Sequence, residues 1–82
     1  MDYTDRECEI FNDMLHDFES IDSDMMLRER GLEWGDFKYM GIIIDTLRYK
    51  KQCYVGSKRI ANYFASFGMT VNCYVNECRV QL

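Results

Sequence analysis

The sequence predicts a small α+β domain, in which three to four short helices pack on a C-terminal antiparallel β-hairpin. Two patterns predict this class: apolar residues recur at helical spacing through residues 4–67, and apolar and polar residues alternate over 70–82. The length of 82 residues is that of one small domain. With 48% hydrophobic residues, the chain is too apolar to be disordered.

The first helix is predicted from about residue 4 to residue 19. Thr4 and Glu7 fit a capping box, in which each side chain bonds the backbone amide of the other residue. Apolar residues then recur on one face at helical spacing, and these are Cys8, Phe11, Met14, Leu15 and Phe18. The face is expected to pack against the rest of the domain.

A second, shorter helix is predicted over residues 24–30. Gly31 is expected to end it in the left-handed conformation that glycine adopts readily. Residues 31–35 then form a turn that carries the only tryptophan, Trp34. Asp36 is expected to cap the element that follows.

A third helix is predicted over residues 36–51, although the isoleucines at 42–44 are β-branched and also compatible with a strand. Residues 52–55 form a short extended link. Ser57 is expected to cap a fourth helix, which Gly68 ends. The apolar face of this helix consists of Ile60, Ala61, Phe64 and Phe67.

The hairpin is predicted over the last fourteen residues, 69–82, with a two-residue turn at Asn76 and Glu77. This register places only apolar residues on one side, pairing Val75 with Cys78, Cys73 with Val80, and Val71 with Leu82. A slip of one residue would mix polar and apolar residues on each side. A longer loop remains possible, because Glu77 suits a tight turn less well than glycine.

The four cysteines are expected to be reduced and partly buried. The chain begins with an acidic segment that is unlike a signal or transit peptide, and it holds no apolar run of membrane-spanning length. These features predict a cytoplasmic protein without a membrane segment, in which disulfides are rare. With one histidine, His16, and no CxxC pair, we expect no metal site and no cofactor.

Acidic and basic residues are sorted along the chain. Residues 1–36, the acidic helical part, carry twelve acidic and three basic groups and a net charge of −9. Residues 37–82, the basic helix and hairpin part, carry seven basic and two acidic groups and a net charge of +5. The total of −4 therefore conceals a dipolar charge distribution. Summed charge controls long-range fields and encounter rates, so this asymmetry indicates a charged partner.

An acidic stripe is predicted on the first helix. Four carboxylates recur every four residues and therefore share a face: Asp5, Glu9, Asp13 and Asp17. Like charges at this spacing destabilise a helix by about 0.2–0.5 kcal/mol per pair, so helix stability does not explain them. Such a stripe can imitate a phosphate backbone and occupy the basic groove of a nucleic-acid-binding protein. The alternative interpretation is an ordinary solvated face that provides solubility.

In size and acidity the chain is similar to small phage and mobile-element inhibitors of restriction and CRISPR systems. The similarity is one of composition and covers no alignable motif. The first functional hypothesis is therefore a non-catalytic inhibitor or regulator that uses the acidic stripe to bind a basic surface of a protein partner.

A basic segment over residues 46–59 carries five cations, two tyrosines and no carboxylate. Ser57 opens a helix there, and the free amides of a helix N-terminus attract anions. The residues that would bind an anion or a nucleic acid are Arg48, Lys50, Lys51, Ser57, Lys58 and Arg59. The alternative interpretation is a solvated basic rim whose charges the acidic first helix offsets.

The predicted order of a helix, a short strand, another helix and a terminal hairpin is similar to the winged helix-turn-helix layout. This similarity implies a DNA- or RNA-binding regulator that uses residues 46–59. The chain departs from the layout because Gly68 leads directly into a strand, where a recognition helix is needed. Its net acidity also disfavours tight binding to phosphates.

Catalysis is not expected. His16 lies among carboxylates on a predicted exposed face, and the sequence holds no glycine-rich nucleotide loop and no GxSxG motif. Trp34 is either a plug over the core or an exposed anchor for a partner. Opposite charged patches on one chain also make a homodimer possible.

Overall fold

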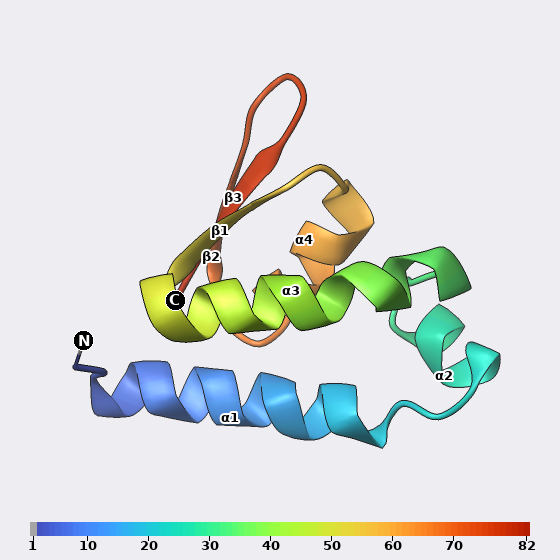
Figure 1. Ribbon diagram of the computed structural model, residues 1–82, viewed down its shortest axis with the longest axis horizontal. Coiled ribbons are helices and arrows are strands. Elements are labelled where there is room, and N and C mark those ends of the chain that lie inside the picture. Colours follow the sequence, from blue (N-terminus) through green and yellow to red (C-terminus); the bar gives the residue numbers. More distant parts are fainter. Residues whose placement is uncertain (1) are drawn as a thin grey trace.

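The computed structural model describes residues 2–82 and confirms the α+β class. Four helices and three strands follow one another along the chain (Figure 1): α1 (Asp5–Ser20), α2 (Asp24–Glu29), α3 (Trp34–Lys50), β1 (Gln52–Val55), α4 (Lys58–Ala65), β2 (Thr70–Cys73) and β3 (Cys78–Gln81).

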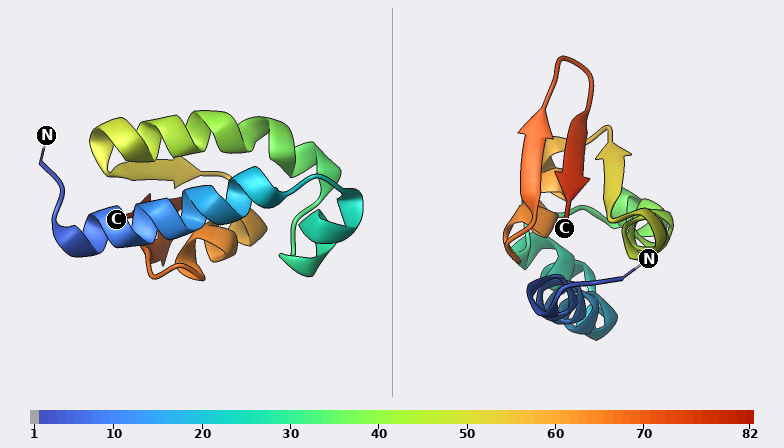
Figure 2. Two further views of the ribbon diagram at one scale, coloured as in Figure 1. Left: turned by 90° about the horizontal axis from the view of Figure 1, so that it is seen from below. Right: turned by 90° about the vertical axis from the view of Figure 1, so that its left-hand side faces the viewer.

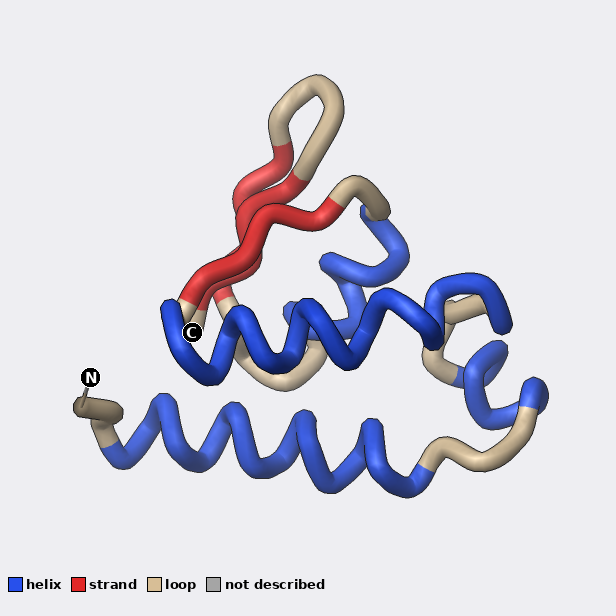
Figure 3. The backbone as a smooth tube through the Cα atoms, in the orientation of Figure 1, coloured by secondary structure: helices blue, strands red, loops and turns tan. Residues whose placement is uncertain are grey.

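The elements form a thin molecule with extents of 35 × 31 × 18 Å. Helices α1 and α3 run side by side in opposite directions, and α2 connects them at one end (Figures 1 and 3). The sheet stands on the C-terminal end of α3, and α4 covers one of its faces (Figure 2). The core lies where the inner sides of α1, α3, α4 and the sheet meet, and its largest fully buried side chains are Phe64, Met14, Leu27, Leu32, Met40, Leu47 and Val80.

The capping box predicted for α1 is confirmed. The Glu7 amide donates to Thr4 Oγ1 at 3.1 Å, and the Thr4 amide donates to Glu7 Oε1 at 2.8 Å. The buried face differs slightly from the predicted one, because Ile10 is buried and Cys8 is exposed. Ile10 therefore belongs to the buried face of α1, and Cys8 does not.

Gly31 ends α2 as predicted. Its φ is +74°, and its amide donates to the carbonyl of Arg28 at 2.9 Å. The amide of Leu32 reaches back to the carbonyl of Leu27, also at 2.9 Å, which completes a Schellman motif. Leu32 is buried beside the end of the helix.

Helix α3 begins at Trp34, so the predicted turn over 31–35 is shorter than expected. Asp36 is not the cap. It lies in the first turn, and its Oδ2 accepts the amide of Glu33 at 2.9 Å. The isoleucines at 42–44 are helical, not extended, because Ile43 and Ile44 continue the buried side of the helix.

The hairpin register predicted from the sequence is wrong by two residues. Cys73 lies opposite Cys78 and Val71 opposite Val80, so the loop contains four residues, and Val75 is 97% exposed in it. A third strand, β1, pairs with the other edge of β3, which gives the sheet order β1–β3–β2. A slip of two residues keeps every side chain on its predicted face.

The expectation of reduced cysteines is wrong for one pair. Cys73 and Cys78 are joined by a disulfide at the end of the hairpin ladder. The four-residue loop places them directly opposite each other, with 3.9 Å between their Cα atoms. Cys8 and Cys53 are free thiols, and burial raises the pKa of the Cys53 thiol.

Among residues 2–82, no helix has the length and apolar character needed to cross a membrane.

Candidate functional site

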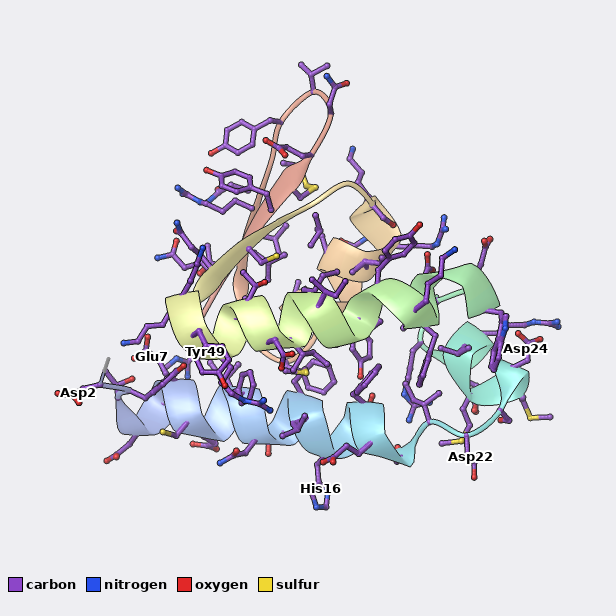
Figure 4. All side chains as sticks on the ribbon, in the orientation of Figure 1. Asp2, Glu7, His16, Asp22, Asp24 and Tyr49 are labelled. Atoms are coloured by element: carbon purple, nitrogen blue, oxygen red, sulfur yellow. A yellow bond between two sulfur atoms is a disulfide. The ribbon has the colours of Figure 1, made fainter. Side chains whose placement is uncertain are left out.

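The outer face of α1 displays three exposed carboxylates, those of Asp5, Glu9 and Asp13, here called the acidic face. None of the three forms an ion pair within residues 2–82. Successive members are separated by about 6 Å along the helix axis. His16 points away from the body of the domain on the same helix (Figure 4). The acidic face is therefore available to another molecule.

Asp17 is separated from the other three carboxylates of the predicted stripe. Its two oxygens accept hydrogen bonds from the Arg30 guanidinium, each at 2.8 Å, and from the Tyr63 hydroxyl at 2.7 Å. Four residues turn an α-helix by about 400°, so the stripe drifts by about 40° per step and its fourth member reaches the packed side. The Arg30 guanidinium lowers the pKa of Asp17, although burial opposes this shift.

Two cations of the basic segment are neutralised by carboxylates of the acidic part. Lys51 Nζ lies 3.1 Å from Glu7 Oε1, which brings together residues 44 positions apart. Arg59 pairs with Asp36 at 2.5 Å and with Glu33 at 3.4 Å. The two charged parts therefore compensate each other within the fold at these points.

Asp36 is the most buried carboxylate among these ion pairs. The Asp36 side chain is only 5% exposed, whereas that of Arg59 is 47% exposed. The guanidinium lowers the pKa of Asp36, burial opposes this effect, and the Glu33 amide adds to the lowering. This carboxylate joins the N-terminus of α3 to the first turn of α4.

The remaining cations of the segment differ in exposure. Arg48 pairs with Asp45 at 3.2 Å, and its guanidinium lies 5.3 Å from the centre of the Phe11 ring. Lys50 and Lys58 are exposed and form no ion pair within residues 2–82. The segment therefore offers two free ammonium groups to an anion, not five cations.

Ser57 caps α4, as the sequence predicts. Its hydroxyl accepts the amide of Ile60 at 3.4 Å, so the side chain already serves one of the free amides at the helix start. Its predicted role in binding an anion stays a prediction.

Trp34 is exposed, so its interpretation as a core plug is wrong. Its side chain lies at the start of α3 and is 68% exposed. The indole stacks on Phe37 with 6.1 Å between ring centres, and Phe37 stacks on Phe18 with 5.0 Å. This support holds the indole at the surface, where its role as an anchor stays a prediction.

Sequence reasoning missed the other exposed apolar residues of α3. Tyr39, Ile42 and Tyr49 are 53%, 69% and 71% exposed. Tyr39 and Ile42 also border an open groove of about 430 Å³ between α3 and the segment from β1 to α4. The sequence indicates this exposure, because the apolar residues of α3 occur on all sides of the helix and not in one stripe.

No family model matches the chain, and no curated protein or solved structure is significantly similar to it.

Proposed function

We propose that this protein is a non-catalytic inhibitor or regulator, and that the acidic face of α1 binds a basic, nucleic-acid-binding surface of a protein partner. The observation that carries the proposal is the difference in pairing between charges. The carboxylates of the acidic face have no ion-pair partner within residues 2–82, whereas the carboxylates of Glu7, Asp17 and Asp36 are paired.

Within the acidic face, only Asp5, in the first turn of α1, is stabilised by the helix dipole, so the stability of the helix does not explain Glu9 and Asp13. Glu9 lies four residues from both Asp5 and Asp13 and repels each of them, which destabilises the helix by about 0.2–0.5 kcal/mol per pair. A row of free carboxylates attracts a positively charged surface over long range and raises the rate of encounter with it. A groove that binds phosphates is such a surface, and occupying it would inhibit the partner as anti-restriction and anti-CRISPR proteins of phages and mobile elements do.

The proposal is tested by reversing the charge of the acidic face. The variant Asp5→Lys, Glu9→Lys, Asp13→Lys is compared with Asp22→Lys, Glu29→Lys, Glu77→Lys, which changes the net charge equally at exposed carboxylates elsewhere. Partners captured from the native host are identified by mass spectrometry, with circular dichroism as the check on folding. We expect basic, nucleic-acid-binding proteins to be lost with the first variant and kept with the second. Equal capture by both variants would contradict the proposal.

The second candidate function is a DNA- or RNA-binding regulator that uses the basic segment. The observation that favours it is the exposure of Lys50 and Lys58. Two observations disfavour it: carboxylates engage Arg48, Lys51 and Arg59, and residues 66–69 between α4 and β2 contain no recognition helix. A gel-shift titration at low salt decides the question, since electrostatic binding to nucleic acid is strongest there.

A further inference from the structure

We propose that the outward face of α3 is the interface of a symmetric homodimer. Two copies of α3 would pack antiparallel about a two-fold axis that passes close to Gly41 and Ile42. This proposal is independent of the acidic face, because it rests on a different helix and on residues that the proposed function does not use.

The outward face of α3 is apolar and accessible. Trp34, Ile42 and Tyr49 lie on the side opposite the buried residues of the helix, and they are among the most exposed apolar residues of the described chain. Together with positions 38, 41 and 45 they occupy an arc of about 100° of the helix surface. Seen from below, α3 is the outermost element on this side of the molecule (Figure 2, left). Neither α1 nor α4 covers it.

The sequence of this face is complementary to itself when one copy is reversed. In an antiparallel pair related by a two-fold axis, each residue i meets a residue j of the second copy, and i plus j is constant. One value of this sum matches three pairs at once: Trp34 meets Tyr49, Lys38 meets Asp45, and Gly41 meets Ile42. The pairs are aromatic with aromatic, cation with anion, and small with large.

Gly41 has no explanation within the single chain. A glycine in the middle of a helix destabilises it by about 1 kcal/mol relative to alanine. Its φ is not positive, and a Cβ atom built on it would have no atom within 4 Å. In the dimer this open position would receive the Ile42 side chain of the second copy and would allow the helix axes to approach to about 8 Å.

The charged pair would define the alignment of the two helices. Lys38 Nζ lies 5.1 Å from the centre of the Tyr39 ring, and Asp45 forms an exposed ion pair with Arg48. The Asp45 side chain is 65% exposed, so it remains accessible to a second cation. Exposed pairs contribute little affinity, but they disfavour alignments that bring like charges together.

The self-complementary pattern identifies a second copy, and not an unrelated apolar protein, as the occupant. An unrelated partner would place no constraint on pairs within this chain, whereas a two-fold axis constrains all three. The face is about 24 Å long, which is small for a permanent interface. We therefore expect a reversible dimer whose population depends on concentration.

The dimer has a consequence for the acidic face that rests on the proposed function. The two-fold axis is perpendicular to α3 and to the line that joins the two copies. Because α1 lies beside α3 along one edge (Figure 1), both copies of α1 would lie along the same edge of the dimer. Two acidic faces would then act together, and a partner with two basic sites would bind more tightly through effective concentration.

Sedimentation equilibrium of the whole chain from about 10 μM to about 1 mM tests the dimer. We expect a monomer–dimer equilibrium that Ile42→Asp weakens by at least about tenfold, since two like charges would meet near the axis. Val75→Asp is the control, because Val75 is 97% exposed in the hairpin loop. A monomer at every concentration, or a dimer that Ile42→Asp leaves unchanged, would overturn the proposal.

A mixing experiment tests the antiparallel alignment itself. Lys38→Glu and Asp45→Lys should each form a weaker homodimer than the natural chain, because each sets like charges opposite each other. A mixture of the two variants restores both oppositely charged pairs, so the heterodimer should be tighter than either homodimer. Lys58→Glu, which alters an exposed cation on another helix, should leave dimerisation unchanged. Absence of any gain on mixing would overturn this alignment, and it would leave the acidic-face proposal untouched.

Discussion

The charges on the outer face of α1 stay exposed and unpaired in the described part of the chain, whereas charges of the basic segment over residues 46–59 are paired. Asp5, Glu9 and Asp13 keep their charges exposed and without ion-pair partners in residues 2–82. In the basic segment, Lys51 and Arg59 are neutralised by carboxylates from the acidic part of the chain. A charge run in a sequence is therefore not the same thing as a charged surface.

The difference arises from where each group lies relative to the packed elements. The carboxylates of the acidic face are exposed on α1. The basic segment, in contrast, crosses the junction between α3, β1 and α4 (Figure 1). Carboxylates from α1 and from the start of α3 reach that junction. Paired charges at the junction therefore join different elements, and the charges of the acidic face stay exposed.

The largest effect that separates the two regions is expected on acidification. Hydrogen bonds lower the pKa of three carboxyl groups in the folded protein below their values in the unfolded chain, which are about 4. The donors are the Thr4 amide and then Lys51 for Glu7, Arg30 for Asp17, and Arg59 for Asp36. The stabilisation by these carboxylates is therefore complete above about pH 5 and is lost as the pH falls through the lowered folded values. Urea unfolding followed from about pH 7 to about pH 2 should show a free energy of unfolding that is level at first and then declines. A stability that is constant below about pH 4 would contradict the role of these pairs.

Removing the buried carboxylate at the junction should have the next largest effect. Asp36→Asn replaces charge-assisted hydrogen bonds to Arg59 with neutral ones, and we expect a loss of about 2 kcal/mol in the free energy of unfolding. Asp45→Asn is the matched control, because its ion pair with Arg48 is exposed. That control should change stability by less than about 0.5 kcal/mol. Equal losses in urea unfolding of the two variants would show that burial is unimportant at Asp36.

A smaller effect is expected from removing one hydrogen bond to Asp17, the fourth carboxylate of the predicted stripe. Tyr63→Phe removes the hydroxyl that donates to Asp17 at 2.7 Å and keeps the ring. Loss of one such bond should destabilise the protein by about 1 kcal/mol in thermal or urea unfolding. Tyr39→Phe, at an exposed tyrosine, should have an effect within about 0.5 kcal/mol. If Tyr63→Phe matched this control, Asp17 would not be held by the hydroxyl.

The smallest effect concerns the acidic face and has the opposite sign. Glu9→Gln relieves repulsion from both Asp5 and Asp13, so we expect stability to rise by about 0.2–0.5 kcal/mol at low salt. The same substitution at Glu7 should lower stability, because Glu7 accepts from Thr4 and Lys51. Chemical unfolding at low and at high salt compares the two variants, and the gain from Glu9→Gln should shrink as salt screens the repulsion. A loss of stability with Glu9→Gln would show that the acidic face supports the fold.

Most helix limits could be predicted because they depend on chemistry within a few residues. The hydrogen bonds that form these helix ends join residues only three to five positions apart. They involve Thr4 with Glu7, the residues around Gly31, and Ser57. Alternation along 70–82 similarly predicted which side of each strand faces the core. It could not predict the hairpin register, because a slip of two residues preserves the same alternation.

The candidate site was less predictable from the sequence. The periodicity placed Asp17 with Asp5, Glu9 and Asp13, but the drift of the helix turned it toward Arg30 and Tyr63. The exposure of Trp34 also depended on where α3 begins, which a local pattern fixes only to within a few residues.

The sequence by itself determined the α+β class, the caps at Thr4, Gly31 and Ser57, and the inward faces of the strands. These follow from hydrogen bonding and periodicity between neighbours along the chain. Only the tertiary structure decided the pairing of β3 with β1, the exposed side of α3 and the charges that remain free. Each of these depends on groups far apart in the chain, as the contact between Glu7 and Lys51 across 44 positions illustrates. Whether a charge is neutralised depends on its neighbours in space, and packing alone brings those neighbours together.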